Sequence, residues 1–165
     1  MVTILHPITP LLVQQYKEVR LRALQDTPSA FGSTYLRESL FSDEDWVQRA
    51  LNWNGERGMG YLASVNDTYG GIAGCFLRQD DPLKADLVSM WVAPELRKAG
   101  VGRRLVEAIE AWARESEAQT LLLMVTSKNF TAMDFYRRIG FSMTGRTEPY
   151  PNDPALVEYE MAKAL

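Results

Sequence analysis

The segment Arg97–Gly102 constrains the fold of this chain more than any other, because it joins two elements with different hydrophobic periods. The apolar run 87–92 predicts a strand that stops at Ala93-Pro94, and an amphipathic helix is expected to begin near Val101. The first turn of a helix presents backbone N–H groups with no partner inside the helix. The glycines at 100 and 102 lack the Cβ that would keep a ligand away. The Arg97–Gly102 turn therefore predicts an α/β arrangement with an anion-binding helix start.

Positive charge surrounds this turn, with Arg97 and Lys98 before the glycines and Arg103 and Arg104 after them. A helix start that is merely solvated favours acidic residues, because the helix dipole places partial positive charge there. Four basic residues around a helix start are contrary to that preference. The charge pattern therefore favours a bound phosphate over a solvated helix end.

Two common phosphate-binding patterns are excluded by their spacing. The dinucleotide fingerprint Gly-x-Gly-x-x-Gly requires a third glycine where this chain has Leu105. The P-loop requires a Gly-Lys pair, and the chain contains none. What remains is Arg-x-x-Gly-x-Gly at a strand-to-helix turn, which resembles the acyl-CoA pyrophosphate loop of the GNAT superfamily of N-acyltransferases. The resemblance implies cofactor contacts from Arg97, Lys98, Ala99, Gly100, Val101, Gly102 and Arg103.

The composition favours one globular domain spanning residues 1–165, close to the commonest domain size. A formal net charge of −3 argues against a general nucleic-acid binder, which carries a basic surplus. The single cysteine, Cys75, and the single histidine, His6, support neither a disulfide framework nor a metal site nor a catalytic triad. No apolar run reaches the ~20 residues of a membrane span, and the chain begins without a basic-then-apolar leader. We therefore expect a cytoplasmic protein with no metal and no membrane or nucleic-acid partner.

Hydrophobic periodicity and turn residues predict the order strand, two helices, three strands, helix, strand, helix, two strands. The expected strands are 2–5, 61–65, 71–77, 85–92, 121–125, 141–147 and 157–162. The expected helices are one capped by Thr9-Pro10 that runs to about Leu24, one opened by a Ser42–Asp45 capping box that runs to about Leu51, one beginning near Val101, and one at 129–139. The stretch 26–40 is expected to be irregular or part helix, and 52–60 a glycine-rich loop. This order predicts a mixed α/β fold with a mostly antiparallel central sheet flanked by helices, and it resembles the GNAT fold over nearly the whole chain.

A second motif lies in residues 129–141, where an Asn is followed by an Ala three positions later, then by a Phe-Tyr pair and a final Gly-Phe. Asn129, Ala132 and Tyr136 fall at i, i+3 and i+7, so they share one face of the expected helix. The pattern is similar to one in GNAT proteins. The resemblance implies that Asn129 lies near the pantetheine arm of CoA and Tyr136 near its sulfur, whereas Phe135 is expected to be a core aromatic.

The resemblance also implies direct attack of a primary amine on an acetyl thioester within a ternary complex. A tyrosine with an ordinary pKa of about 10 is protonated at neutral pH, so Tyr136 is the candidate acid for the departing thiolate. Backbone groups of Met90, Trp91 and Val92 are expected to stabilise the oxyanion and to pair with the pantetheine amides. For Trp91, packing on the pantetheine arm and burial in the core both stay open.

No general base is assigned from the sequence. Asp86 and Glu38 are the options, and each is more simply explained as a surface acid. In the family the acceptor lies between the segment that joins the first two helices and the loop between the last two strands, here 31–41 and 148–154. The resemblance therefore implies substrate contacts from Tyr35, Glu38 and Tyr150, whose charge and ring faces attract an ammonium group.

The expected function is that of an acetyl-CoA-dependent N-acetyltransferase acting on a primary amine of a small molecule or peptide. The alternative is a non-catalytic acyl-CoA-binding or sensor module of the same fold, and the presence of Tyr136 with an uninterrupted Arg97–Gly102 turn favours the enzyme. An RNA-binding protein is a poor third, because it would need a wider basic face with exposed aromatics. The identity of the acceptor, the length of the acyl chain and the formation of a homodimer stay open.

Overall fold

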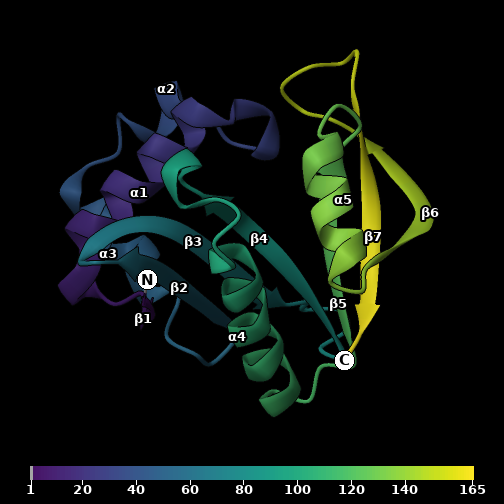
Figure 1. Ribbon diagram of the computed structural model, residues 1–165, viewed down its shortest axis with the longest axis horizontal. Coiled ribbons are helices and arrows are strands. Elements are labelled where there is room, and N and C mark those ends of the chain that lie inside the picture. The colour runs from purple at the N-terminus through teal and green to yellow at the C-terminus, as the bar shows by residue number, and fades with distance from the viewer. Residues whose placement is uncertain (1) are drawn as a thin grey trace.

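One seven-stranded sheet forms the centre of the molecule in residues 2–165, the part of the chain that this computed structural model describes (Figure 1). The strands are β1 (Thr3–Pro7), β2 (Gly58–Val65), β3 (Thr68–Leu77), β4 (Lys84–Val92), β5 (Thr120–Thr126), β6 (Ser142–Pro149) and β7 (Val157–Ala164). The α-helices are α1 (Val13–Asp26), α2 (Tyr35–Glu38), α3 (Asp43–Leu51), α4 (Val101–Glu115) and α5 (Phe130–Arg138). The predicted order is confirmed, and α2 is a short helix inside the stretch that was expected to be irregular or part helix.

The strand order β1-β2-β3-β4-β5-β7-β6 contains one parallel pair, β4 with β5, and the remaining neighbours are antiparallel. β4 and β5 pair only where Lys84–Asp86 meets Thr120–Leu122. Beyond this point the two strands diverge, while β5 stays paired with β7 as far as Thr126. Figure 1 shows the resulting V, with β1–β4 in one arm and β5–β7 in the other. The sheet is mixed and mostly antiparallel, as predicted, and it opens in the middle.

A β-bulge bends β4 just beyond the point of divergence. Two of its residues, Ser89 and Met90, oppose a single residue of β3. Ser89 has a φ of 58°, a left-handed conformation that is uncommon for residues other than glycine. At the bulge Met90 lies against the start of α4, and the next residue, Trp91, places its ring against the end of α1. The bulge therefore determines which β4 side chains face each layer of helices.

Helices cover both faces of the sheet and bury its apolar side chains. α1 and α3 lie on one face, where the Tyr16 and Trp46 rings meet edge to face with centroids 5.6 Å apart. α4 lies on the other face, where Leu105 packs against Gly71 of β3. Figure 1 views the molecule from the side of α4 and α5. Removal of these apolar side chains from water is the main stabilising contribution to such a layered fold. Among the helices of residues 2–165, none has the length and hydropathy needed to cross a membrane.

The prediction that 52–60 forms a glycine-rich loop is wrong at its end, because β2 already begins at Gly58. Gly58 and Gly60 allow close packing instead of a turn. An added Cβ would come within 2.7 Å of the Phe76 ring at Gly58 and within 2.9 Å of the Trp53 ring at Gly60.

Of the two helix caps predicted near the N-terminus, the one at Thr9 is wrong and the one at Ser42 is confirmed. Thr9 does not cap α1, because it precedes a separate 3₁₀ turn, Pro10–Leu12, and its side chain makes no capping hydrogen bond in the described part of the chain. α1 then begins at Val13. The Ser42–Asp45 capping box at the start of α3 is confirmed, with both reciprocal hydrogen bonds present.

Candidate active site

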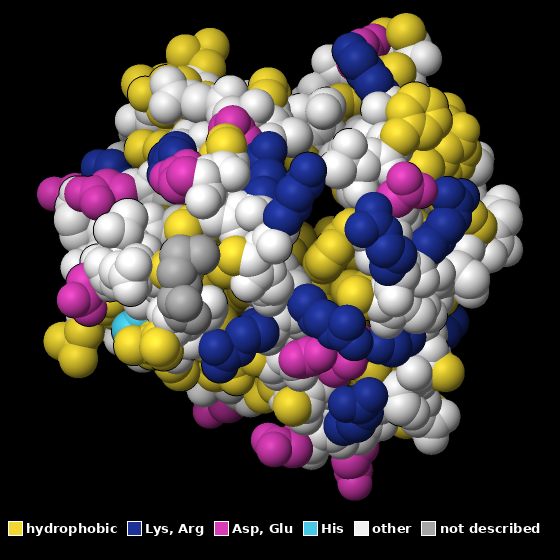
Figure 2. Space-filling model, viewed as in Figure 1, with side chains coloured by type: hydrophobic (Ala, Val, Ile, Leu, Met, Phe, Trp, Pro, Cys, Tyr) yellow, Lys and Arg dark blue, Asp and Glu magenta, His cyan; other side chains and the backbone are white. Residues whose placement is uncertain are grey.

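A cleft of about 480 Å³ opens where β4 and β5 diverge. From Leu87 onward the edge of β4 that faces β5 pairs with no strand in residues 2–165, so backbone groups along it are available to a ligand. Side chains from both arms of the sheet and from three helical segments line the cleft, among them Arg20, Ser89, Met90, Asn129, Tyr136 and Glu158. Figure 2 shows a hollow between the start of α4 and α5, with hydrophobic atoms at its floor and Lys and Arg side chains at its rim.

The start of α4 presents unpartnered backbone amides next to this cleft. Gly100 caps the helix with a φ of 80°, and its position is open, because an added Cβ would meet no atom within 4 Å. The first hydrogen bond of the helix runs from the N–H of Arg104 to the carbonyl of Gly100 at 3.1 Å. The N–H groups of residues 101–103 therefore have no partner inside the helix. In the described chain no side chain caps this end and no acidic residue lies in its first turn, so the helix start suits an anion.

Gly102 connects the start of α4 to the floor of the cleft. A Cβ added there would lie 3.1 Å from Cε of Met90 and 3.3 Å from Cζ of Phe135. The neighbouring side chains of Lys98, Ala99 and Arg103 are exposed, whereas Val101 packs into the core. The glycine therefore lets the first turn of α4 approach β4 and α5 closely.

The Arg97 side chain holds the turn in place and does not extend toward the cleft. Its Nε donates to the carbonyl of Val92 at 2.9 Å, and its Nη2 lies 2.6 Å from a carboxylate oxygen of Asp26 at the end of α1. The indole N–H of Trp91 donates to the same oxygen at 3.0 Å. Trp91 is buried, and neither it nor Val92 is among the residues that line the cleft. Of the two roles left open for Trp91, its position agrees with burial in the core.

Asn129, Ala132 and Tyr136 all line the cleft, so they share one face of α5, as their spacing predicted. Asn129 caps α5, because its side-chain oxygen accepts from the N–H of Ala132 at 3.2 Å. Tyr136 is held between Phe135 and Phe141, whose ring centroids lie 5.3 and 5.6 Å away. Burial raises the pKa of Tyr136, so the phenol stays protonated at neutral pH. Its hydroxyl makes no hydrogen bond to the rest of residues 2–165 and is a donor available to a ligand in the cleft.

Glu38 occupies a different environment from the one predicted for a substrate contact. The residue is 1% exposed, and its carboxylate accepts from Nε and Nη2 of Arg20, each at 2.9 Å, and from Nη1 of Arg49 at 2.6 Å. Burial opposes ionisation, but the hydrogen bonds and charge of the two arginines outweigh it and hold the pKa of Glu38 at about 2. Its oxygens are therefore fully engaged, and Glu38 orients Arg20 instead of reaching the cleft.

Arg20 and Ser89 belong to the cleft, and the sequence analysis missed both. Arg20 is buried, lines the cleft and donates from Nη1 to Oγ of Ser89 at 3.2 Å, which ties α1 to the bulge of β4. One signal was available for Arg20: it stands on the apolar stripe of α1, four residues from Tyr16 and from Leu24. A charge in that stripe indicates a buried partner. No local signal marks the bulge at Ser89.

Asp86, an option for the general base, lines the cleft but is paired. Its two oxygens accept from Nε and Nη2 of Arg78 at 2.9 and 2.8 Å. This two-point ion pair keeps the carboxylate oriented toward Arg78. Asp86 is thus a half-exposed, engaged acid instead of the free surface acid that the sequence suggested.

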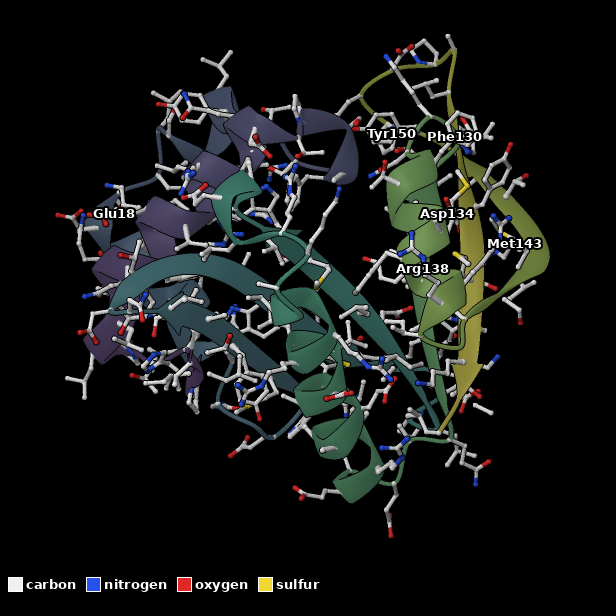
Figure 3. The ribbon with its side chains drawn as sticks, in the orientation of Figure 1. Glu18, Phe130, Asp134, Arg138, Met143 and Tyr150 are labelled. Atoms are coloured by element: carbon white, nitrogen blue, oxygen red, sulfur yellow. The ribbon has the colours of Figure 1, made fainter. Side chains whose placement is uncertain are left out.

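A second, shallower pocket brings together the two segments that were expected to surround the acceptor. Tyr35 and Tyr150 both line it, beside Lys128 and Asp153. Tyr35 is 40% exposed, whereas Tyr150 is buried and its hydroxyl donates to the carbonyl of Phe31 at 2.7 Å. Figure 3 shows Tyr150 above α5, between the loop that follows β6 and the segment after α1. Tyr150 therefore holds these two segments together, and Tyr35 forms part of the rim.

Comparison with known proteins gives consistent matches over most of the chain. A family model described as "Acetyltransferase (GNAT) family" matches residues 20–141. The peptidyl-lysine N-acetyltransferase YjaB of Escherichia coli (strain K12) is 38% identical over 69 residues, which are 38% of this chain and 44% of that protein. The IAA acetyltransferase of Azospirillum brasilense is 40% identical over 65 residues, 39% of this chain and 42% of that protein. The chain thus matches less than half of the length of these two relatives.

The fold is shared with solved structures at low sequence identity. The PaiA N-acetyltransferase from Thermoplasma acidophilum, solved in complex with coenzyme A, superimposes with a TM-score of 0.79 and 17% identity, covering 100% of both chains. At that identity the likeness establishes a common fold. The V-shaped sheet and its helices are therefore found in a protein that holds coenzyme A.

Proposed function

The chain belongs to the acetyltransferase (GNAT) family, and we propose that it transfers an acetyl group from acetyl-CoA to a primary amine by direct attack within a ternary complex. One observation carries the proposal: Tyr136, whose hydroxyl is unpaired in residues 2–165, lines the cleft, and the unpartnered amides at the start of α4 lie next to it, because Gly102 packs against the lining residue Met90. The amides can bind the diphosphate of CoA, and the Tyr136 hydroxyl can donate a proton to its sulfur. Transfer of an acetyl group from a CoA thioester requires both functions.

We propose that the diphosphate of the cofactor binds at the start of α4. The N–H groups of residues 101–103 point out of the helix end, and Gly100 and Gly102 leave room for the phosphate oxygens. Lys98 and Arg103 are exposed beside them and add positive charge. Arg97 acts on the cofactor indirectly, because its side chain fixes the turn to Val92 and Asp26.

The pantetheine arm follows the open edge of β4. Beyond Leu87 this edge has free backbone groups over the length of Met90–Val92, apart from the carbonyl of Val92 that Arg97 occupies. Amides of the arm would pair with this edge as an added strand does. The side-chain amide of Asn129, whose oxygen caps α5, has its nitrogen available in the same cleft.

The chemistry requires a positioned acid and a positioned oxyanion site. As the amine nitrogen attacks the thioester carbon, negative charge develops on the carbonyl oxygen, and a backbone N–H of β4 near Met90 is available to stabilise it. When the C–S bond breaks, the Tyr136 hydroxyl donates its proton to the departing thiolate. The raised pKa of Tyr136 keeps the hydroxyl protonated until negative charge develops on the sulfur.

The acceptor enters from the α1 side, opposite α5. We call this wall, formed by Arg20, Phe31, Thr126 and Glu158, the acceptor side of the cleft. The second pocket, with Tyr35 and Tyr150, shares Ser29 with the cleft and lies next to it. The E. coli relative is named as a peptidyl-lysine acetyltransferase, which supports a peptide amine as the acceptor, and another relative is named as a blasticidin-S acetyltransferase, which supports a small molecule.

A thiol-release assay tests this function. The protein is incubated with acetyl-CoA and, separately, a lysine-containing peptide, a peptide with a free N-terminal alanine, a linear polyamine and an aromatic monoamine, and each product is analysed by mass spectrometry. We expect thiol release with at least one amine, matched by one added acetyl group on that amine. If the protein binds CoA but releases no thiol with any of the amines, the result would contradict the proposal and favour an acyl-CoA-binding module.

A further inference from the structure

Glu158 stands on the acceptor side of the cleft. It lies on β7 directly opposite Thr126 of β5 in the antiparallel pair, and residues directly opposite each other share one face of the sheet. The Thr126 hydroxyl donates to the carbonyl of Ser29 at 3.0 Å, so this face is the one that carries α1. Glu158 also lines the same cleft as Tyr136 of α5. The carboxylate and the phenol thus approach the cleft from its two opposite sides.

Glu158 differs from the other acids of this region because its carboxylate has no side-chain partner in the described part of the chain. Glu38 is held by two arginines and Asp86 by both nitrogens of one Arg78 fork. Glu160 accepts from the hydroxyl of Thr144 at 3.0 Å and lies within 3.7 Å of an Arg78 nitrogen. In residues 2–165 Glu158 takes part in no ion pair and no side-chain hydrogen bond. It is the unengaged carboxylate among these four.

The surroundings of Glu158 are unfavourable for a carboxylate with no function. Glu148 of β6 lies directly opposite it, and like charges in that position destabilise a sheet. Burial and the charge of Glu148 raise the pKa of Glu158. Three arginines of this region are paired with other acids: Arg146 bonds to Glu148, Arg78 to Asp86, and Arg20 to Glu38. A carboxylate with a raised pKa is a stronger proton acceptor than an ordinary one.

We propose, on the basis of the acetyl transfer proposed above, that Glu158 is the general base that accepts a proton from the acceptor amine. The lone pair of the amine nitrogen forms the N–C bond, the C–S bond breaks, and its electron pair leaves on sulfur. The nitrogen loses one proton to the Glu158 carboxylate, and the sulfur gains one from the Tyr136 hydroxyl. Solvent then removes the proton from Glu158 and returns one to the tyrosine. The net products are the acetylated amine and the free thiol of CoA.

The test compares the Glu158→Gln variant with the parent protein and a matched control. Glutamine keeps the size of the side chain and removes its capacity to accept the proton. With acetyl-CoA and the best amine of the panel above, we expect kcat to fall about 100-fold or more. CoA affinity measured by calorimetry should not change. In the parent protein kcat should fall on the acid side at a pH above 4.5, the ordinary glutamate value, and this limb should be absent from the variant.

Glu148→Gln is the control, because Glu148 faces Glu158 but does not line the cleft. Removal of its charge lowers the pKa of Glu158, since the repulsion that raised it is gone. This variant should therefore keep its kcat at neutral pH while its acid limb moves to lower pH. A structural role of Glu158 alone would not produce that shift.

Three results would overturn the proposal. Equal kcat in Glu158→Gln and parent would remove Glu158 as the base while leaving acetyl transfer intact. A rise in KM with unchanged kcat would assign it to ammonium binding instead of proton transfer. If the parent protein binds CoA but releases no thiol with any amine, both the transferase function and the assignment of Glu158 as base would be wrong. This outcome is distinguishable from the other two.

Discussion

Replacing Glu38 by Gln should destabilise the protein by an amount that follows from the buried ion pair. The carboxyl has a pKa of about 2 in place of its ordinary 4.5. Because one pH unit of difference corresponds to about 1.4 kcal/mol, the ionised form stabilises the folded state by about 3 kcal/mol at neutral pH. Glu38 is 1% exposed, so water screens this interaction little. The value agrees with the about 3–5 kcal/mol expected when one partner of a buried ion pair is removed.

Urea unfolding followed by tryptophan fluorescence measures this loss. At pH 7 we expect the free energy of unfolding of Glu38→Gln to lie about 3 kcal/mol below that of the parent protein, with a melting temperature about 6–12 °C lower. Glu95→Gln is the matched control, because Glu95 also pairs with an arginine, at 2.7 Å, but on the surface. That variant should lose less than about 1 kcal/mol.

The difference between parent and Glu38→Gln must also depend on pH in a defined direction. A carboxyl whose pKa is lowered by folding stabilises the native state above its ordinary pKa. That contribution disappears as the pH falls from 4.5 to about 2. The two proteins should therefore differ fully at pH 5 and above and converge toward pH 2. Equal stabilities at pH 7, or a difference that does not shrink over this range, would refute the assignment of Glu38 to a buried, ionised pair.

Three further substitutions test other parts of the site. Gly102→Glu should weaken CoA binding, measured by calorimetry, by at least about 100-fold, or about 2.7 kcal/mol, because the new side chain brings bulk and negative charge to the diphosphate. The smaller Gly102→Ala substitution should weaken binding less. Equal CoA affinities of Gly102→Glu and the parent protein would exclude this helix start as the anion site. Tyr136→Phe should lower kcat about 100-fold in the thiol-release assay with CoA affinity retained, and unchanged turnover would remove the phenol from the mechanism. Asn129→Ala should lower the free energy of unfolding in urea by about 1 kcal/mol through loss of the α5 cap, and an unchanged midpoint would show that the cap contributes nothing.

The parts of the site that sequence reasoning predicted depend on local patterns. The Arg97–Gly102 turn follows from a change of hydrophobic period next to glycines, and the shared face of Asn129, Ala132 and Tyr136 follows from helical spacing. The Ser42–Asp45 capping box is equally local. Each of these patterns involves residues that are close together in the chain, so its local geometry can be predicted without knowledge of the tertiary fold.

The parts that sequence reasoning missed depend on residues far apart in the chain. Glu38 is buried because Arg20 and Arg49 reach it from two other helices. The bulge at Ser89 becomes visible only in the register between β3 and β4. Glu158 reaches the cleft because β7 pairs with β5 on the far arm of the V. None of these relations has a signature in a short window of sequence.

We propose that the start of α4 and Tyr136 bind one molecule of CoA at the cleft between β4 and β5. A crystal structure of the protein with CoA tests it most directly. We predict diphosphate oxygens about 3 Å from the N–H groups of residues 101–103, and the sulfur beside the Tyr136 hydroxyl. A diphosphate bound elsewhere, or a sulfur outside the cleft, would contradict the account.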